Sequence, residues 1–315
     1  MLGYIARRIA GALLTVFVVA TLAFVIMSII PGDAAFYVLG EEATGADILQ
    51  FRERLGLNDP VHVRLGRWYW SLVHGDLGES ITHAGESVAS LILARLEPTI
   101  ILAVFASTVG IILGLTTGVL AAVWRGGPID FACMIIALLG ISVPNFWLAL
   151  NLILVFSLKL RLLPVAGYVP ISEGFLQTLQ HLLLPALALG VSQSAVIARM
   201  TRANLLQVLS EDYMRTARSK GVHEWRVIVF HGLRNSMIPT LGVIGISVAL
   251  VLGGAIISEI IFVIPGLGSL TVNSILRRDY PVLQGILMLV AFLTAGVNLA
   301  IDLLYGVLDP RIRYT

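Results

Sequence analysis

The sequence predicts an all-α membrane protein with six transmembrane helices and both termini in the cytoplasm. Hydrophobic residues make up 57% of its 315 residues and charged residues 13%, which is about half the charge of a typical soluble domain. The mean hydropathy is +0.92, and most charges lie between long uncharged runs. A bilayer solvates such apolar surface, whereas water does not. These observations exclude a water-soluble globule and predict that residues 1–315 form a single transmembrane domain.

Six uncharged runs are long enough to cross the hydrocarbon core, which takes about 20 residues. Interior prolines such as Pro144 and Pro185 are tolerated, because neighbouring helices can satisfy the freed backbone groups. A secretory signal peptide is the alternative for the first run, but the run exceeds the usual apolar length of about 7–15 residues and Pro31-Gly32-Asp33 is no cleavage site. The expected spans are 9–30, 98–124, 131–158, 178–198, 237–260 and 285–308.

The distribution of basic residues predicts the orientation of these spans. With the amino terminus inside, the cytoplasmic pieces hold 12 of the 21 basic residues in 61 positions. The outer segments 31–97, 159–181 and 263–284 hold the other 9 in 112 positions, together with 12 of the 19 acidic residues. Because short cytoplasmic loops carry an excess of lysine and arginine, both termini are expected in the cytoplasm.

An amphipathic helix is expected within the outer segment 31–97. Asp59 is read as its N-cap and Pro60 as its first residue. The run Trp68-Tyr69-Trp70 suits a membrane interface, where amphipathic rings are favoured. The helix either packs on the outer ends of the spans or helps to dock a partner. Its apolar residues recur at helical spacing at Val61, Leu65, Trp68 and Leu72.

The longest cytoplasmic segment, 199–236, is expected to form a pair of short helices. Ser210 is predicted to cap the first helix, which carries acidic residues in its first turn and basic residues later, as the helix dipole favours. Gly221 is expected just past its end, in the left-handed conformation that glycine adopts most easily. A second helix is predicted from about His223 to Asn235 and Pro239. This pair of helices is interpreted either as a solvated hairpin without a partner or as a contact surface for a partner protein.

The same segment resembles the EAA loop of ABC import permeases, and in detail the oligopeptide and dipeptide family. The resemblance rests first on residues 211–221 and 231–239, and it extends over essentially the whole chain, with a long first outer segment similar to B-type members. The family's Glu-Ala-Ala is Thr216-Ala217-Arg218 here, a form usual in peptide-type members. The further matching motifs are Pro31-Gly32-Asp33, Leu55-Gly56-Leu57, residues 75–80, Ser142-x-Pro144-x-Phe146-Trp147, His181 to Pro185, residues 265–268, Arg278-Asp279-Tyr280-Pro281 and residues 309–314.

The resemblance implies a type I importer subunit in the bacterial inner membrane, where lipid surrounds it. It implies a second, similar permease, two cytoplasmic ATPase subunits and an extracytoplasmic solute-binding protein as partners. The loop at 210–236 would be the coupling helix that docks on an ATPase. Its coupling residues would be Asp212, Arg215, Thr216, Ala217, Arg218, Lys220 and Gly221.

The sequence carries no motif for ATP binding or bond chemistry. No phosphate-loop motif occurs, and neither of the two lysines, Lys159 and Lys220, follows a glycine-rich turn. The six histidines are scattered, and the single Cys133 permits no intrachain disulfide. The chain is therefore expected to be a non-catalytic subunit without a cofactor, with ATP and magnesium bound by its partners. A net charge of +2 gives no reason to expect nucleic-acid binding.

Two ionisable residues fall within or at the ends of the spans, and a charge there should face protein or water. Glu259 lies towards the outer end of the fifth span, and Asp302 towards the inner end of the sixth, four residues after Asn298. They are read either as part of the pathway and its gate or as pairing groups between helices or subunits. Small residues in the fifth span permit close helix approach.

The sequence bears on three classes of function for a membrane protein of this kind. The preferred one is an ATP-driven importer of peptides. The same machinery could carry glutathione, a nickel complex, an opine or a sugar instead. A secondary transporter is disfavoured because neither inverted repeats nor further intramembrane charges are evident. An intramembrane enzyme is disfavoured because no nucleophile and base are placed together.

Overall fold

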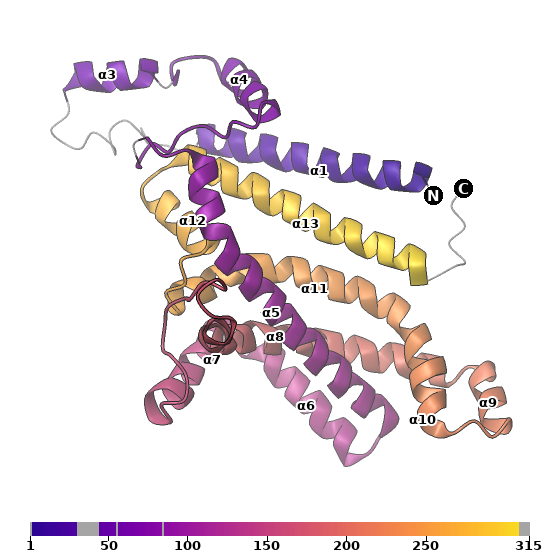
Figure 1. Cartoon of the computed structure of the whole chain (residues 1–315). Coiled ribbons are helices and arrows are strands. Elements are labelled where there is room, and N and C mark those ends of the chain that lie inside the picture. Colours follow the sequence, from indigo (N-terminus) through magenta and orange to yellow (C-terminus); the bar gives the residue numbers. More distant parts are fainter. Residues whose placement is uncertain (1, 30–43, 55, 84, 309–315) are drawn as a thin grey trace. The chain divides into compact units, whose positions relative to one another are not determined.

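The structure is a computed structural model that describes residues 2–29, 44–54, 56–83 and 85–308, most of them in helices (Figure 1). The chain divides into two compact units. The first comprises Met1–Glu97 and Pro265–Gly296, and the second comprises Pro98–Ile264 and Val297–Thr315. The motifs at residues 31–33 and 309–314 lie outside the described residues.

Five helices in the described part are long and apolar enough to cross a membrane, and a bent pair brings the number of spans to six if it is counted as one. Long uncharged runs form these helices because a helix satisfies every backbone group within its own segment. The five are α1 (Leu2–Ile29), α5 (Val88–Val123), α8 (Phe175–Leu209), the continuous helix Glu224–Ile261 that ends in α11 (Arg234–Ile261), and α13 (Tyr280–Leu308).

The bent pair occupies the run that was expected to form one helix at 131–158. Helix α6 (Pro128–Ser142) is followed by α7 (Asn145–Leu152) and the π-helical η1 (Ile153–Lys159), with a bend of 103° between them. Val143 has φ −82° and ψ 122°. Proline disfavours the helical conformation in the residue before it, so α6 ends ahead of Pro144, which is the N-cap of α7.

In the first unit, the amphipathic helix α4 (Val61–Val73) packs on α1 through aromatic rings. The Phe17 and Tyr69 rings stack with centroids 5.1 Å apart, and the Tyr69 hydroxyl lies 2.6 Å from the Thr21 hydroxyl. The N-cap is Pro60 rather than the predicted Asp59, whose carboxylate instead pairs with Arg67 at 2.7 Å. This unit also holds α3 (Gly45–Arg54) and α12 (Leu267–Leu276), a short apolar helix within the expected outer loop 263–284.

A buried carboxylate fastens the segment that follows α4. Asp279, which is 1% exposed, accepts hydrogen bonds from the hydroxyls of Ser80 at 2.5 Å and Thr82 at 2.6 Å. The backbone N–H groups of Ile81 and Thr82 also donate to it, each at 3.2 Å. Charge-assisted bonds of this kind are among the stronger ones in proteins. The apolar core beside them consists of Val88, Ile92, Leu267, Leu270, Val282 and Ile286.

In the second unit, α8 packs against α6, α7 and α11. Glycines on α5 let that helix approach α8 closely, since a Cβ at Gly114 would lie 2.6 Å from Ile197 and one at Gly118 would lie 2.7 Å from the Ala198 carbonyl oxygen. The first turn of α6 is tied to α8 by Arg202, whose guanidinium donates to both carboxylate oxygens of Asp130 at 2.6 and 2.7 Å.

Candidate functional site

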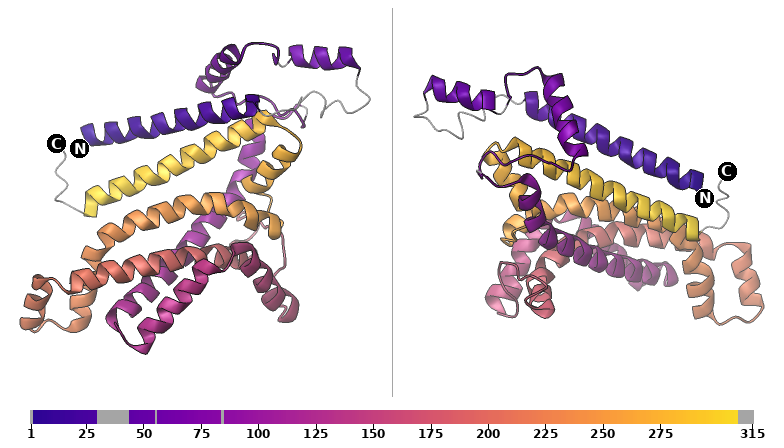
Figure 2. Two further views of the ribbon diagram at one scale, coloured as in Figure 1. Left: turned by 180° about the vertical axis from the view of Figure 1, so that it is seen from behind. Right: turned by 45° about the horizontal axis from the view of Figure 1, so that its top comes forward.

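The cytoplasmic segment predicted at 199–236 forms a helical hairpin that projects beyond the ends of α8 and α11 (Figure 2). It contains α9 (Asp212–Ser219), α10 (Glu224–Arg226) and the π-helical η2 (Val227–Leu233). Helix α8 runs on to Leu209, well past the expected end of the span at 198. The second helix of the hairpin does not stop at Pro239 but continues through it into α11, so the hairpin is joined to a membrane-spanning helix without a break.

Helix α9 ends in a tight glycine cap. Gly221 has φ +75°, and its N–H donates to the Arg218 carbonyl at 2.9 Å while the Val222 N–H donates to the Ala217 carbonyl at 3.3 Å. This pair of bonds is the Schellman motif, which requires the left-handed conformation at its glycine. A Cβ at Gly221 would meet nothing within 4 Å, so only the backbone conformation demands glycine there.

The start of α9 differs from the prediction. Its N-cap is Glu211, which makes no side-chain capping bond, and Ser210 belongs to the end of α8. The Ser210 hydroxyl donates to the Gln207 carbonyl at 2.6 Å, so it satisfies a terminal acceptor of α8 instead of a donor of α9.

A small apolar anchor holds α9 against the rest of the hairpin. Met214 is the one buried residue of α9, and it is fully inaccessible. Its side chain lies over Gly232, where an added Cβ would meet Leu205 at 3.1 Å, Leu209 at 3.4 Å and Met214 at 3.5 Å. Glycine on η2 therefore leaves the room that the methionine fills. A buried methionine of this kind contributes on the order of 2–5 kcal/mol relative to alanine.

Polar contacts complete the hairpin at its surface. The Arg218 guanidinium pairs with the Glu224 carboxylate at 3.0 Å across the turn at Gly221. The Asn235 amide donates to the Tyr213 hydroxyl at 2.9 Å and links α9 to the start of α11. Exposed ion pairs contribute little to stability, about 0–1 kcal/mol, so the anchor rather than the charges positions α9.

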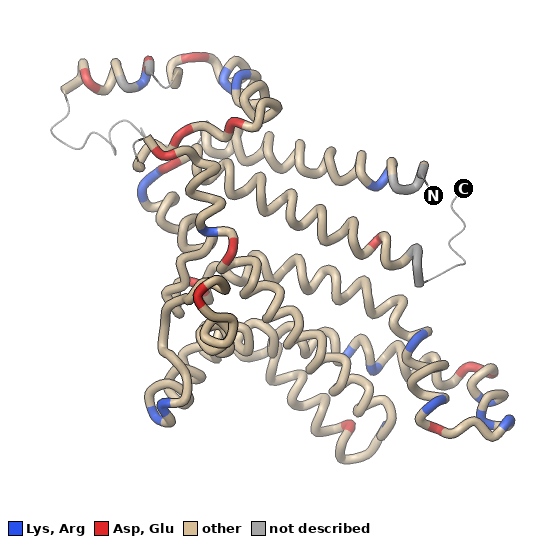
Figure 3. Tube along the Cα trace, viewed as in Figure 1, with Lys and Arg blue, Asp and Glu red and all other residues tan. Residues whose placement is uncertain are grey.

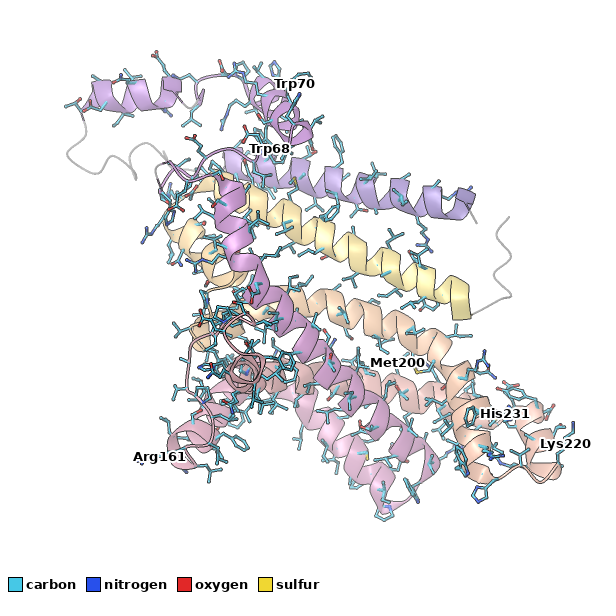
Figure 4. The ribbon with its side chains drawn as sticks, viewed as in Figure 1. Trp68, Trp70, Arg161, Met200, Lys220 and His231 are labelled. Carbon is cyan, nitrogen blue, oxygen red and sulfur yellow. The ribbon has the colours of Figure 1, made fainter. Side chains whose placement is uncertain are left out.

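The structure brings the seven predicted coupling residues together on α9 and its terminal turn. Lysine and arginine positions gather on this hairpin together with acidic ones (Figure 3), and Lys220 lies at its tip while His231 lies on η2 (Figure 4). Ala217 is half-buried, and the other six are exposed: Asp212, Arg215, Thr216, Arg218, Lys220 and Gly221. The result is a short, exposed ridge of charged side chains in which Arg215 pairs with Asp212 at 3.4 Å and Arg218 with Glu224 at 3.0 Å, while Lys220 lies at the tip.

Sequence periodicity missed an aromatic pair on the second arm of the hairpin. The rings of Trp225 and Phe230 lie 5.8 Å apart although the residues are five apart in the chain. An α-helix places residues three or four apart on one face, whereas the wider π-helical turn bonds residue i to i+5. Trp225 is 49% exposed and Phe230 is 59% exposed, so the pair adds an apolar surface to the hairpin.

The other predicted residues do not form one site. Glu259 on α11 is fully buried and accepts a 2.5 Å hydrogen bond from the Thr99 hydroxyl on α5, which favours pairing between helices. Asn298 is exposed and Asp302 is half-buried on α13. Ile301, the residue before Asp302, faces Gly245 on α11. Gly245 precedes Glu259 by 14 positions, which is about 20 Å along a helix.

Comparison with known proteins identifies the family. Residues 110–314 match the model described as "Binding-protein-dependent transport system inner membrane component", and residues 1–103 match that of its N-terminal part. A putative peptide transport system permease protein of Brucella abortus (strain 2308) is 43% identical over 100% of both chains. The glutathione transport system permease protein GsiC of Escherichia coli (strain K12) is 41% identical, again over 100% of both chains.

Solved structures agree on the fold. The inward-facing MetNI methionine ABC transporter matches with a TM-score of 0.58 at 19% identity, over 70% of this chain and 97% of that chain. An amino acid ABC transporter matches with a TM-score of 0.52 at 19% identity, over 69% of this chain and 94% of that chain. The apolar spans, the projecting hairpin and these matches lead to one conclusion: the chain belongs to the family of binding-protein-dependent transport system inner membrane components, the multi-pass permease subunits of ABC importers.

Proposed function

We propose that the chain forms half of a translocation pathway for peptides and couples it to cytoplasmic ATPase subunits through the hairpin at 210–236. Cargo would arrive from an extracytoplasmic binding protein and pass between this chain and a second, similar permease. The peptide class is supported by relatives over the full length that are named as peptide permeases. Glutathione, itself a small peptide, is the second candidate, because a glutathione permease is 41% identical.

The observation that carries the coupling role is that the exposed charged ridge of α9 is anchored through the buried Met214. Met214 packs α9 over Gly232 of η2, η2 in turn packs on α8, and η2 continues into α11. A force applied to α9 is therefore passed to two membrane-spanning helices. ATP binding would draw the ATPase subunits together, move the two coupling hairpins and open the path outward. Hydrolysis and release of the products would reset it. Such coupling requires that each state of the permease bind the ATPases differently.

The test is the substitution Gly221→Val in the complete complex in proteoliposomes. A β-branched residue in the left-handed conformation costs about 1–2 kcal/mol or more, so the turn should reshape while the spans remain in place. We expect uptake of trialanine per ATP hydrolysed to fall by about tenfold, the factor that corresponds to about 1.4 kcal/mol.

The matched control is Gly75→Val. Gly75 ends α4 with φ +78° and an equally open Cβ position, but it lies in the predicted outer segment. We expect the ratio of uptake to hydrolysis to stay at the wild-type value in this variant. An unchanged ratio in Gly221→Val, or an equal loss in both variants, would refute the coupling role.

A further inference from the structure

A cavity of about 190 Å³ in the first unit is lined by residues of α4, of the end of α1 and of the start of α13. Two sequence motifs that the coupling hairpin does not use meet there, because Leu57 of Leu55-Gly56-Leu57 and Pro281 of Arg278-Asp279-Tyr280-Pro281 both line it. Phe24 contributes from near the end of the membrane-spanning α1. The cavity therefore lies where the spans leave the hydrocarbon core, at one membrane interface.

Two arginines of α4 supply all the charge that the described residues bring to the cavity lining. Arg64 and Arg67 are three positions apart, so they lie on one face of the helix. Arg67 pairs with Asp59 at 2.7 Å and stays 63% exposed. The guanidinium carbon of Arg64 lies 5.9 Å from the centre of the Phe24 ring, and Arg64 makes no ion pair with any residue that the structure describes. Two cations with one paired carboxylate leave a net positive charge.

The Arg64 guanidinium is available to a ligand. The side chain is half-buried, but its nitrogens are not enclosed, whereas the Tyr280 hydroxyl on the same cavity is. Burial lowers the pKa of Arg64, although a guanidinium remains charged at any physiological pH. A bound anion would replace the lost water by accepting charge-assisted hydrogen bonds, and it would relieve the repulsion between Arg64 and Arg67.

The surroundings favour a lipid phosphate over a soluble anion. The rest of the cavity lining is mostly apolar. Helix α4 also carries Trp68 and Tyr69, residue types that gather at membrane interfaces, and α1 exposes Leu22 and Ile26 on either side of Phe24 in the chain. An amphiphile can place its anionic head on the arginines and its chains along α1. The cavity is smaller than the 300–1,000 Å³ of sites that enclose a whole small ligand, so it admits the head group alone.

We propose that Arg64 and Arg67 form a head-group site for an anionic phospholipid at the membrane interface, with Arg64 as the main contact. The guanidinium fork matches the geometry of a phosphate oxygen pair. The bound lipid would fill the space between the amphipathic helix and the end of α1. The site is independent of the cargo and of the coupling role of the hairpin.

The test titrates the delipidated complete complex in detergent with phosphatidylglycerol and counts the bound lipids by native mass spectrometry. Phosphatidylcholine with the same acyl chains is the zwitterionic comparison. We expect Arg64→Gln to weaken one phosphatidylglycerol site by about tenfold, the size of a charge-assisted hydrogen bond, and to leave phosphatidylcholine binding unchanged. The matched control Arg277→Gln removes an exposed arginine of the same unit outside the cavity and should bind like wild type.

A gain of binding separates the proposal from misfolding. Asp59→Asn removes the carboxylate that competes for Arg67, so it should tighten the same site by about two- to fivefold. Excess glycerol 3-phosphate or trialanine should not displace the lipid. Equal phosphatidylglycerol binding in wild type and Arg64→Gln, or no tightening in Asp59→Asn, would overturn the proposal. Displacement by glycerol 3-phosphate would assign the arginines to a soluble phosphate, and displacement by trialanine to the carboxylate of the cargo; either result also overturns it.

Discussion

The ends of α4 and α9 have the same backbone geometry in very different surroundings. At the end of α4 the Gly75 N–H donates to Leu72 at 3.0 Å and the Asp76 N–H to Ser71 at 2.9 Å, in the same pattern that Gly221 and Val222 make after α9. Yet α4 stacks aromatic rings on α1 and is followed by the segment fastened to Asp279, whereas α9 buries one methionine and exposes its charges.

This difference shows what a glycine cap does and does not determine. The cap ends a helix and turns the chain, which both segments need. The neighbouring side chains then decide how the helix is held, because no residue of α4 is buried whereas Met214 of α9 is. A helix that stacks its rings on a neighbouring helix, as α4 does, is part of the framework. A helix held by a single buried anchor with its polar face exposed, as α9 is, is suited to contact another protein.

The largest expected effect on stability is the loss of the hydrogen bonds between Asp279 and the segment after α4 in Asp279→Ala. Several buried or part-buried donors, including the Ser80 and Thr82 hydroxyls, would lose their acceptor, at a cost of about 3 kcal/mol or more. Hydrogen exchange of residues 79–88 should accelerate strongly, while exchange in α9 stays unchanged. Asp279→Asn keeps an acceptor oxygen and should lose less. Equal protection in wild type and Asp279→Ala would show that these bonds do not hold the segment.

A smaller effect is expected when the anchor of the hairpin is removed in Met214→Ala. The fully buried side chain leaves a cavity, which typically costs about 2–5 kcal/mol for methionine. The amides of α9 should then exchange faster while those of α4 keep their protection. The comparison variant is Trp70→Ala on α4, where a side chain that is 70% exposed should matter by about 0.5 kcal/mol or less. Similar effects of the two substitutions would remove the distinction between anchor and surface.

The smallest effect on folding is expected for Arg218→Ala. Its ion pair with Glu224 is exposed, so the hairpin should lose only about 0.2–1 kcal/mol, and less at high salt. Coupling should suffer more than folding, because the same arginine belongs to the proposed docking ridge. The double exchange Arg218→Glu with Glu224→Arg should restore the exchange protection of the hairpin but not the uptake per ATP. Full recovery of both would confine Arg218 to an internal structural role.

The apolar helices and the glycine cap could be predicted from sequence because each depends on local chemistry. Long runs without charge have one stable form in a bilayer, and Gly221 follows a helix with the charge order that the dipole favours. The exposed positions of Arg215, Arg218 and Lys220 follow from the same pattern, because long charged side chains are seldom buried.

The features that sequence did not predict depend on contacts between distant residues or on small departures from α-helical geometry. The bend at Val143 was missed because a proline within a span is compatible with a straight or a broken helix. The pairing of Trp225 with Phe230 needs a π-helical turn.

The most direct test of the central claim places a photoreactive benzophenone side chain at Lys220 or at Trp70 in the complete complex in membranes. Both positions are exposed near the end of a helix that closes with the same cap. We expect the probe at Lys220 to cross-link an ATPase subunit, and the probe at Trp70 to cross-link none. Capture of an ATPase subunit from Trp70, or its absence from Lys220 under conditions that support ATP-driven uptake, would contradict the coupling role of the hairpin.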